Sequence, residues 1–151
     1  MQELAKEKIL EFLNSFVFFE DFTPGEKKKF ANLKSSVVYS ANGDTIIKEG
    51  DFDLSIFILL KGSAAITKSS RPDSVVAKLR KGDIFGEMGY LCKGPRTANV
   101  ISCGDTYSLK LDGEMIDRLN ISLQGKFTSK LIDLLVHRLD NANIQLGKFL
   151  R

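Results

Sequence analysis

Between Ser36 and Leu111 the chain alternates short apolar runs with turn-forming residues, and this pattern most constrains its fold. The runs are rich in valine, isoleucine, phenylalanine and leucine, which favour β-strands. The turn signals recur roughly every ten to twenty residues, a spacing typical of an antiparallel sandwich, roll or barrel. The clearest of them are Asn42-Gly43-Asp44, Gly50-Asp51, Lys61-Gly62, Arg71-Pro72-Asp73, Lys81-Gly82-Asp83 and Cys103-Gly104-Asp105.

Within this region Ile56-Phe57-Ile58-Leu59-Leu60 is apolar at every position. A strand that faces the core on only one side alternates apolar and polar residues, whereas a strand buried on both faces does not. We therefore expect this segment to be a central strand of the sheet.

Helical periodicity flanks the strand-like region on both sides. Apolar residues from Leu4 to Ser15 recur at helical spacing, and Thr23-Pro24-Gly25-Glu26 predicts the start of a second helix that runs to about Leu33. Thr23 can cap the free amides and Glu26 can complete a capping box. After Asp112 the helical period returns as one apolar stripe, formed by Leu131, Leu135, Leu139, Ala142, Leu146 and Leu150.

Composition narrows the class of protein. A chain of 151 residues with 43% apolar and 27% charged residues is long enough for one globular domain with a real core. The net charge of +3 is mild and the basic residues are mixed with acidic ones, which does not indicate a nucleic-acid surface. No apolar run is long enough to span a membrane and no signal peptide is recognisable, so we expect a cytoplasmic protein.

Cysteine and histidine usage argues against metal chemistry. Cys92 and Cys103 are too few for a disulfide framework and fit a reducing compartment. The single histidine, His137, excludes metal sites built from several imidazoles and leaves no recognisable nucleophile and base pair. We therefore expect a protein that is not an enzyme and that holds no metal or cofactor.

The segment from Phe85 to Ser102 places several anion-binding groups close together. Gly86 lacks a Cβ, so ligand oxygens can approach its backbone, and residues 87–91 could form a short helix whose first amides favour an anion. Arg96 presents a planar fork of donors for two phosphate oxygens, and each charge-assisted bond contributes roughly 1.5–3 kcal/mol. Ala98 is small enough to leave room for a ligand.

Two stretches of the chain resemble the cyclic nucleotide-binding domain family, the module shared by catabolite-activator-type regulators, cyclic-nucleotide-dependent kinases and gated channels. The first is Ile46-Ile47-Lys48-Glu49-Gly50-Asp51, followed by Ile56-Phe57-Ile58-Leu59 and Gly62. The second is Phe85-Gly86-Glu87-Met88-Gly89, followed by Arg96-Thr97-Ala98-Asn99-Val100-Ile101-Ser102. Two positions depart from the family pattern: Asp53 stands where a small residue is usual, and Tyr90 where an aliphatic one is usual.

The resemblance implies a single α+β domain over residues 1–151. Its expected parts are N-terminal helices over 1–35, an antiparallel β-roll of the jelly-roll or double-stranded β-helix type over 36–112, and C-terminal helices over 113–151. The phosphate-binding cassette is expected over residues 85–102. In this family the arginine binds the cyclic phosphate and the glutamate holds the ribose 2′-hydroxyl, which implies these roles for Arg96 and Glu87.

The implied ligand is cyclic AMP, with cyclic GMP as the alternative. A hydroxyl residue directly after the arginine, here Thr97, resembles receptors for cyclic GMP, yet related cyclic AMP receptors also carry one. Asn141 and Asn143 fall where the C-terminal helix is expected to cover the base. The full set of expected ligand-binding residues is Phe85, Gly86, Glu87, Met88, Gly89, Arg96, Thr97, Ala98 and Asn143.

Three other readings compete with a nucleotide sensor. The chain could be a scaffold that dimerises through its C-terminal helix and keeps a vestigial pocket, although intact Glu87 and Arg96 argue against this. An enzyme of the cupin type would need several metal-binding histidines. A transcription factor of the activator type would carry a DNA-binding domain after the long helix, so the sequence does not support direct nucleic-acid binding, and the effector that responds to the ligand stays unidentified.

Overall fold

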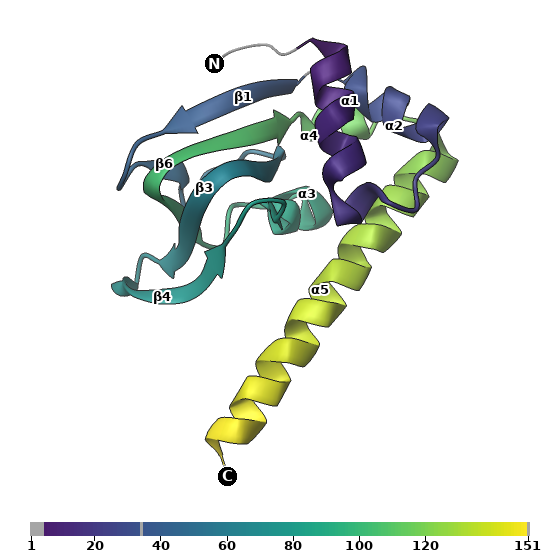
Figure 1. Ribbon diagram of the computed structural model, residues 1–151. Coiled ribbons are helices and arrows are strands. Elements are labelled where there is room, and N and C mark those ends of the chain that lie inside the picture. Colours follow the sequence, from purple (N-terminus) through teal and green to yellow (C-terminus); the bar gives the residue numbers. More distant parts are fainter. Residues whose placement is uncertain (1–4, 34, 151) are drawn as a thin grey trace. The chain divides into compact units, whose positions relative to one another are not determined.

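The computed structural model describes residues 5–33 and 35–150, so Leu4, at the start of the first expected helix, lies outside the described residues. The chain divides into two compact units, Met1–Arg118 and Leu119–Arg151. The first unit contains the sheet and the shorter helices, and the second consists mostly of one long helix (Figure 1). The single domain expected over 1–151 stays a prediction.

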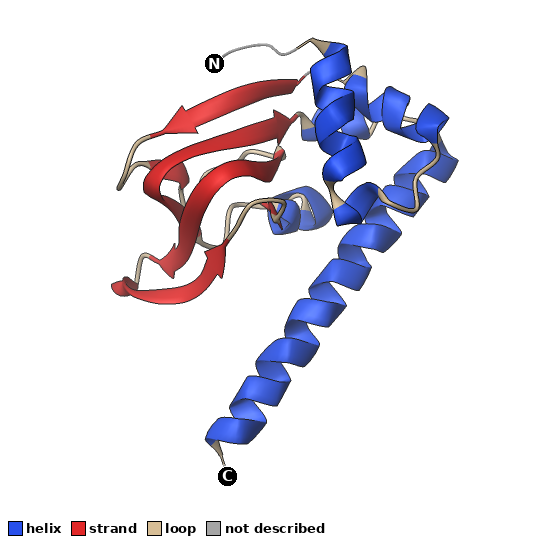
Figure 2. Ribbon diagram, viewed as in Figure 1, coloured by secondary structure: helices blue, strands red, loops and turns tan. Residues whose placement is uncertain are grey.

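A six-stranded antiparallel sheet forms the centre of the first unit (Figure 2). The main path runs β1-β6-β3-β4, with β2 paired to β6 and β5 paired to β3. The expected antiparallel β-roll flanked by helices is therefore confirmed. The strands are β1 (Ser35–Ser40), β2 (Thr45–Ile47), β3 (Ile56–Lys68), β4 (Arg71–Leu79), β5 (Ile84–Phe85) and β6 (Asn99–Leu111).

The strand β3 holds the sheet together, as its apolar sequence predicts. It pairs with β4, β5 and β6, and residues 56–60 are all buried. Side chains from β2, β3, β4, β5 and β6 meet in one core cluster, formed by Ile47, Phe57, Leu59, Ala64, Leu79, Phe85 and Val100. Phe85 and Val100 of this cluster belong to the segment expected to bind a ligand.

Helices at the start of the chain pack through aromatic rings. They are α1 (Lys6–Ser15), the 3₁₀ turn η1 (Val17–Phe19) and α2 (Pro24–Ala31). The Thr23–Glu26 capping box that starts α2 is present, with both of its hydrogen bonds formed. Phe19 and Phe22 each contact Phe30 of α2 at a centroid distance of 5.6 Å, and all three rings are buried in the core.

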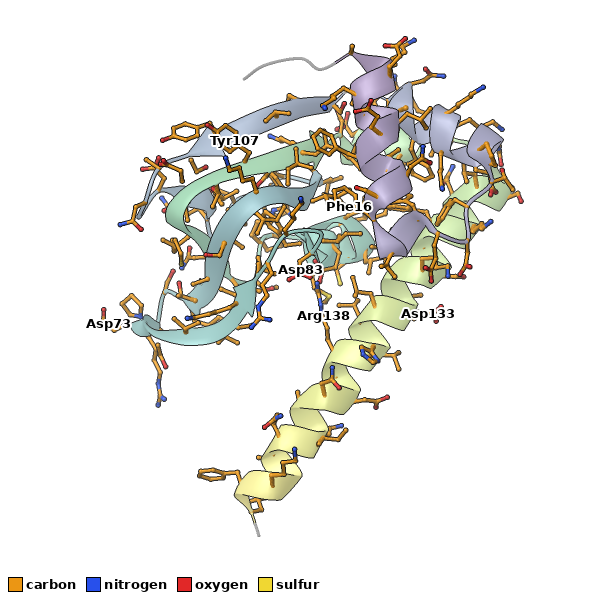
Figure 3. All side chains as sticks on the ribbon, in the orientation of Figure 1. Phe16, Asp73, Asp83, Tyr107, Asp133 and Arg138 are labelled. Carbon is orange, nitrogen blue, oxygen red and sulfur yellow. The ribbon has the colours of Figure 1, made fainter. Side chains whose placement is uncertain are left out.

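Three further helices follow β5. They are α3 (Glu87–Cys92), α4 (Gly113–Ile116) and α5 (Ile121–Phe149), and α5 forms most of the second unit. The side chain of Asn120 caps α5 by accepting a hydrogen bond of 2.9 Å from the Leu123 amide. His137 is exposed on α5, which carries the labelled Asp133 and Arg138 (Figure 3). Among the described residues, no helix is both long enough and apolar enough to cross a bilayer.

Candidate functional site

A tight turn before β5 fixes where the cassette begins. The carboxylate of Asp83, labelled in Figure 3, accepts a hydrogen bond from the Arg80 amide at 2.8 Å. The Asp83 carbonyl accepts from the Leu59 amide at 2.9 Å, and the Leu59 carbonyl accepts from Gly82 at 2.7 Å. These bonds tie the turn to the central strand, so β5 enters the core at a defined position.

The cassette leaves β5 through Phe85 and Gly86 and continues as α3. Phe85 is buried and stacks on Phe57 at a centroid distance of 5.2 Å, which leaves its main chain for any contact with a ligand. Gly86 has φ of 81°, in the left-handed region that favours glycine, and stands at the N-cap of α3. The short helix expected over 87–91 is present as Glu87–Cys92.

Backbone hydrogen bonds join the two motif stretches that the sequence places far apart. The Gly50 amide donates to the Arg96 carbonyl, and the Arg96 amide donates to the Asp51 carbonyl, both at 2.8 Å. The Asn99 side chain adds a third link, because its oxygen accepts from the Glu49 amide at 2.8 Å. Three hydrogen bonds therefore join residues 49–51 to residues 96–99 of the cassette.

The Arg96 side chain lies beneath α3 and is 5% exposed. Its Nη1 donates to the Gly86 carbonyl at 2.6 Å, and its Nη2 donates to the Ser55 carbonyl at 2.7 Å. Burial lowers the pKa of the guanidinium, whereas the nearby charges of Asp53, Glu87 and Asp51 act in the opposite direction. Arginine stays protonated in proteins, so the cassette contains a buried cation.

Two glycines of α3 and its cap make room for this guanidinium. A Cβ at Gly89 would lie 2.7 Å from Arg96 Nη1, closer than real side-chain contacts allow. A Cβ at Gly86 would lie 3.0 Å from the same nitrogen and 3.1 Å from the Ser55 carbonyl oxygen. The glycines at positions 86 and 89 thus have a packing role that the sequence pattern did not reveal.

The other cassette residues differ in exposure. Glu87 is 7% exposed and belongs to the charged surroundings of Arg96. Met88 and Thr97 are exposed and Ala98 is half-buried. The Thr97 carbonyl accepts a hydrogen bond from the Lys68 ammonium, which leaves the Thr97 hydroxyl, the group expected to meet the ligand, outside that bond.

Asn143 lies on α5 in the second unit and is exposed, as is Asn141. The eight other expected ligand-binding residues all lie within residues 85–98 of the first unit. The expected contact of Asn143 with the base stays a prediction.

A cavity of about 730 Å³ lies in the first unit. Its lining contains none of the residues predicted to bind the nucleotide. It is formed by Ser35, Ser36, Phe52, Asp53, Leu54, Ser55, Lys93, Lys110, Asp112 and Glu114. Two of the lining residues, Asp53 and Ser55, are neighbours of Arg96.

Sequence reasoning missed these neighbours for two different reasons. Ser55 acts through its carbonyl, a group that every residue carries, so no sequence signal marks it. Asp53 had a signal, since it departs from the family pattern, yet its closeness to Arg96 depends on the fold. In residues 5–33 and 35–150, no cluster of three or more His, Cys, Asp or Glu side chains is placed to hold a metal ion.

The sequence profile of the cyclic nucleotide-binding domain matches residues 37–120, more than half of the chain. This stretch contains all six strands except the first two residues of β1, and it includes the whole cassette. The chain belongs to the cyclic nucleotide-binding domain family.

Curated relatives include regulatory subunits and kinases. A cAMP-dependent protein kinase regulatory subunit of Neurospora crassa is 39% identical over 72% of this chain and 28% of its own length. A cGMP-dependent protein kinase of Toxoplasma gondii is 36% identical over 76% of this chain and 11% of its own length. The chain thus spans less than a third of either relative.

Solved structures agree with this fold. A cyclic nucleotide-binding domain from Methylobacillus flagellatus has a TM-score of 0.78 at 25% identity, covering 95% of this chain and 83% of its own. The regulatory domain of Toxoplasma gondii PKA, solved with cAMP, has a TM-score of 0.72 at 28% identity, covering 85% of this chain and 50% of its own.

Proposed function

We propose that this chain binds cyclic AMP as a signal, with Arg96 on the cyclic phosphate and Glu87 on the ribose 2′-hydroxyl. Binding is non-covalent, and the chain performs no chemistry on the nucleotide. The observation that carries the proposal is a buried arginine held beneath a short helix next to a buried glutamate.

The chemistry of Arg96 supports its role. A guanidinium carries five N–H donors, and the bonds to Gly86 and Ser55 engage two of them. The remaining donors suit two phosphate oxygens, and a buried site strengthens each bond because little water competes. Glu87 complements this, since an ionised carboxylate can only accept hydrogen bonds and a sugar hydroxyl can donate one.

The relatives support cyclic AMP as the proposed ligand. The Neurospora crassa relative is a regulatory subunit of a cAMP-dependent protein kinase, and the Toxoplasma gondii regulatory domain was solved with cAMP. The exposed Thr97 keeps cyclic GMP as the alternative, because its hydroxyl could bond guanine, and one relative is a cGMP-dependent kinase. The names of these relatives also suggest that a protein partner carries the response.

A binding titration tests the proposal. Calorimetry with cyclic AMP and cyclic GMP should show saturable binding of both, with cyclic AMP tighter. Arg96→Ala and Glu87→Ala should each weaken binding at least tenfold, since each removes charge-assisted hydrogen bonds worth roughly 1.5–3 kcal/mol. The exposed residues Arg80 and Glu20 offer matched controls, because Arg80→Ala and Glu20→Ala change the net charge equally without touching the cassette.

A wild-type protein that binds neither nucleotide contradicts the proposal. In that case the scaffold with a vestigial pocket becomes the better description. A thermal melt distinguishes the two independently, because a ligand selective for the folded state must raise the melting temperature.

A second feature supports dimerisation through α5. Of the apolar stripe expected there, Leu131 is buried, whereas Leu139 and Leu146 are 61% and 54% exposed. These two leucines are seven residues apart, and Ile132, also exposed, lies seven residues before Leu139. A seven-residue apolar repeat is the pattern that a coiled coil buries, so the proposed occupant of this face is a second copy of the chain.

Sedimentation velocity tests the dimer. Wild-type protein should sediment as a dimer at micromolar concentration, and the double variant Leu139→Glu/Leu146→Glu as a monomer. Gln145→Glu, at an exposed position between the leucines, is the charge control and should stay dimeric. A wild-type monomer with and without ligand would remove this proposal and leave nucleotide binding untouched.

A further inference from the structure

The carboxylate of Asp53 lies between two cations. Its Oδ1 is 3.8 Å from Arg96 Nη2, and its Oδ2 is 3.3 Å from Lys110 Nζ. Both cations also lie over the ring of Phe57, at 6.0 Å for Arg96 Cζ and 5.8 Å for Lys110 Nζ. Four side chains from the β2–β3 connection, β3, the cassette and β6 thus form one charged cluster.

Arg96 does not need Asp53 to hold its position. Two main-chain carbonyls, those of Gly86 and Ser55, already fix both ends of the guanidinium at 2.6 and 2.7 Å. The nearest Asp53 oxygen is at 3.8 Å, beyond hydrogen-bond distance. Asp53 therefore acts on Arg96 through its charge rather than by orienting it.

Asp53 is in turn anchored without Arg96. Its Oδ1 accepts a hydrogen bond of 2.9 Å from the Ser55 amide, and Lys110 contacts the other oxygen. Burial alone would raise the pKa of Asp53, but the hydrogen bonds from Ser55 and the charges of Lys110 and Arg96 outweigh it. The pKa lies below its usual value, so the carboxylate is ionised at neutral pH.

We propose that Asp53 lowers the affinity of Arg96 for an anionic ligand, and that Lys110 limits this effect by pairing with the same carboxylate. The inference rests on the proposed function, in which the ligand of Arg96 is a singly charged cyclic phosphate. A phosphate that approaches Arg96 meets a cation whose field is already partly cancelled by a fixed negative charge. Asp53 is thus an affinity-determining residue that does not touch the ligand.

The same charge should stabilise the fold when no ligand is bound. A buried guanidinium without a counter-charge destabilises the fold, and Asp53 supplies part of that counter-charge, beside Glu87 and Asp51. Removing it should lower the stability of the empty protein while it tightens ligand binding. Substituting a residue with a purely structural role would lower both the stability and the ligand affinity. The opposite signs of the two effects therefore identify the charge mechanism.

Asp53→Asn tests the charge of Asp53 most directly. The asparagine side-chain oxygen can still accept from the Ser55 amide, so only the charge is removed. We expect Asp53→Asn to melt at a lower temperature without ligand and to bind cyclic AMP roughly three- to tenfold tighter at low salt. The gain should shrink as salt is raised, because half-exposed charges are screened, and Asp53→Glu should return affinity towards wild type.

Lys110→Met completes a double-mutant cycle. On its own it should weaken binding, because Asp53 then opposes the ligand without compensation. In the Asp53→Asn background the same change should have a smaller effect, since the carboxylate that Lys110 shields is gone.

The outcomes separate the two proposals. Wild-type protein that binds cyclic AMP, together with an Asp53→Asn variant that is folded and binds with equal or weaker affinity, overturns this inference alone. Wild-type protein that binds no cyclic nucleotide overturns the proposed function, and this inference with it. Additive effects of Asp53→Asn and Lys110→Met would also overturn the shielding role of Lys110.

Discussion

The hydroxyl of Tyr90 donates a hydrogen bond of 3.0 Å to one carboxylate oxygen of Asp117, and the Lys93 ammonium contacts the other at 2.9 Å. Lys93 also lies 3.9 Å above the centroid of the Tyr90 ring. Tyr90 belongs to α3 and Lys93 is its C-cap, whereas Asp117 is the C-cap of α4. The helix that covers Arg96 is therefore fixed to the end of α4 by a residue that departs from the family pattern.

Tyr90→Phe should lower the free energy of unfolding by about 1–3 kcal/mol. The substitution keeps the buried ring but removes a hydrogen bond to a charged group. Urea denaturation followed by circular dichroism measures the change. Tyr107→Phe is the matched control, because Tyr107 is 39% exposed on β6 (Figure 3) and should change stability by less than about 0.5 kcal/mol. Equal effects of the two substitutions would contradict the assigned role of Tyr90.

The same contact predicts a loss of stability at alkaline pH. Burial first, and then the hydrogen bond to Asp117, raise the pKa of Tyr90 above its usual value of 10.0. As pH rises above about 10, the phenol of the unfolded chain loses its proton while that of the folded chain still retains it. The free energy of unfolding therefore falls in this range. Wild type should therefore lose more stability than Tyr90→Phe between pH 9 and 11 in parallel urea titrations. Parallel curves for the two proteins would show that Tyr90 titrates normally.

Gly86→Ala and Gly43→Ala separate backbone strain from crowding at the cassette. Gly86 has φ of 81° and Gly43 has φ of 85°, so an alanine at either position is strained by roughly 1–2 kcal/mol. A Cβ at Gly43 meets open space, whereas a Cβ at Gly86 crowds Arg96 and the Ser55 carbonyl. Both variants should lose stability, with Gly86→Ala losing more, and only Gly86→Ala should weaken nucleotide binding in a calorimetric titration. Equal binding by the two variants would contradict the packing of Arg96 beneath α3.

Asn99→Ala should loosen the link between the two motif stretches. The Asn99 oxygen accepts from the Glu49 amide, and its nitrogen donates to the Ser69 hydroxyl at 3.1 Å. Losing the acceptor leaves the Glu49 amide without this partner, which costs about 1–3 kcal/mol. Hydrogen exchange should show faster exchange at the Glu49 amide, with the central strand β3 as the internal reference. Asn99→Asp retains an acceptor and should preserve protection of that amide.

Local sequence signals determined most of the secondary structure. The capping box of Thr23 and Glu26, the apolar strand at 56–60 and the short helix after Gly86 were all predictable, because each depends on neighbours within a few residues. The order of the two motif stretches likewise identified the family and made Arg96 and Glu87 the candidate ligand contacts.

The tertiary structure decided what surrounds those contacts. The partners of Arg96, Asn99 and Tyr90 lie 41, 50 and 27 residues away in the sequence, at Ser55, Glu49 and Asp117. Two of the three partners take part through main-chain groups, which every residue except proline carries in full and which no sequence pattern distinguishes. The position of Asp53 beside Arg96 follows from how the chain between β2 and β3 passes beneath α3. The sequence therefore named Arg96 and Glu87 as the expected ligand contacts, and the fold alone supplied the two carbonyls and the carboxylate that surround the guanidinium.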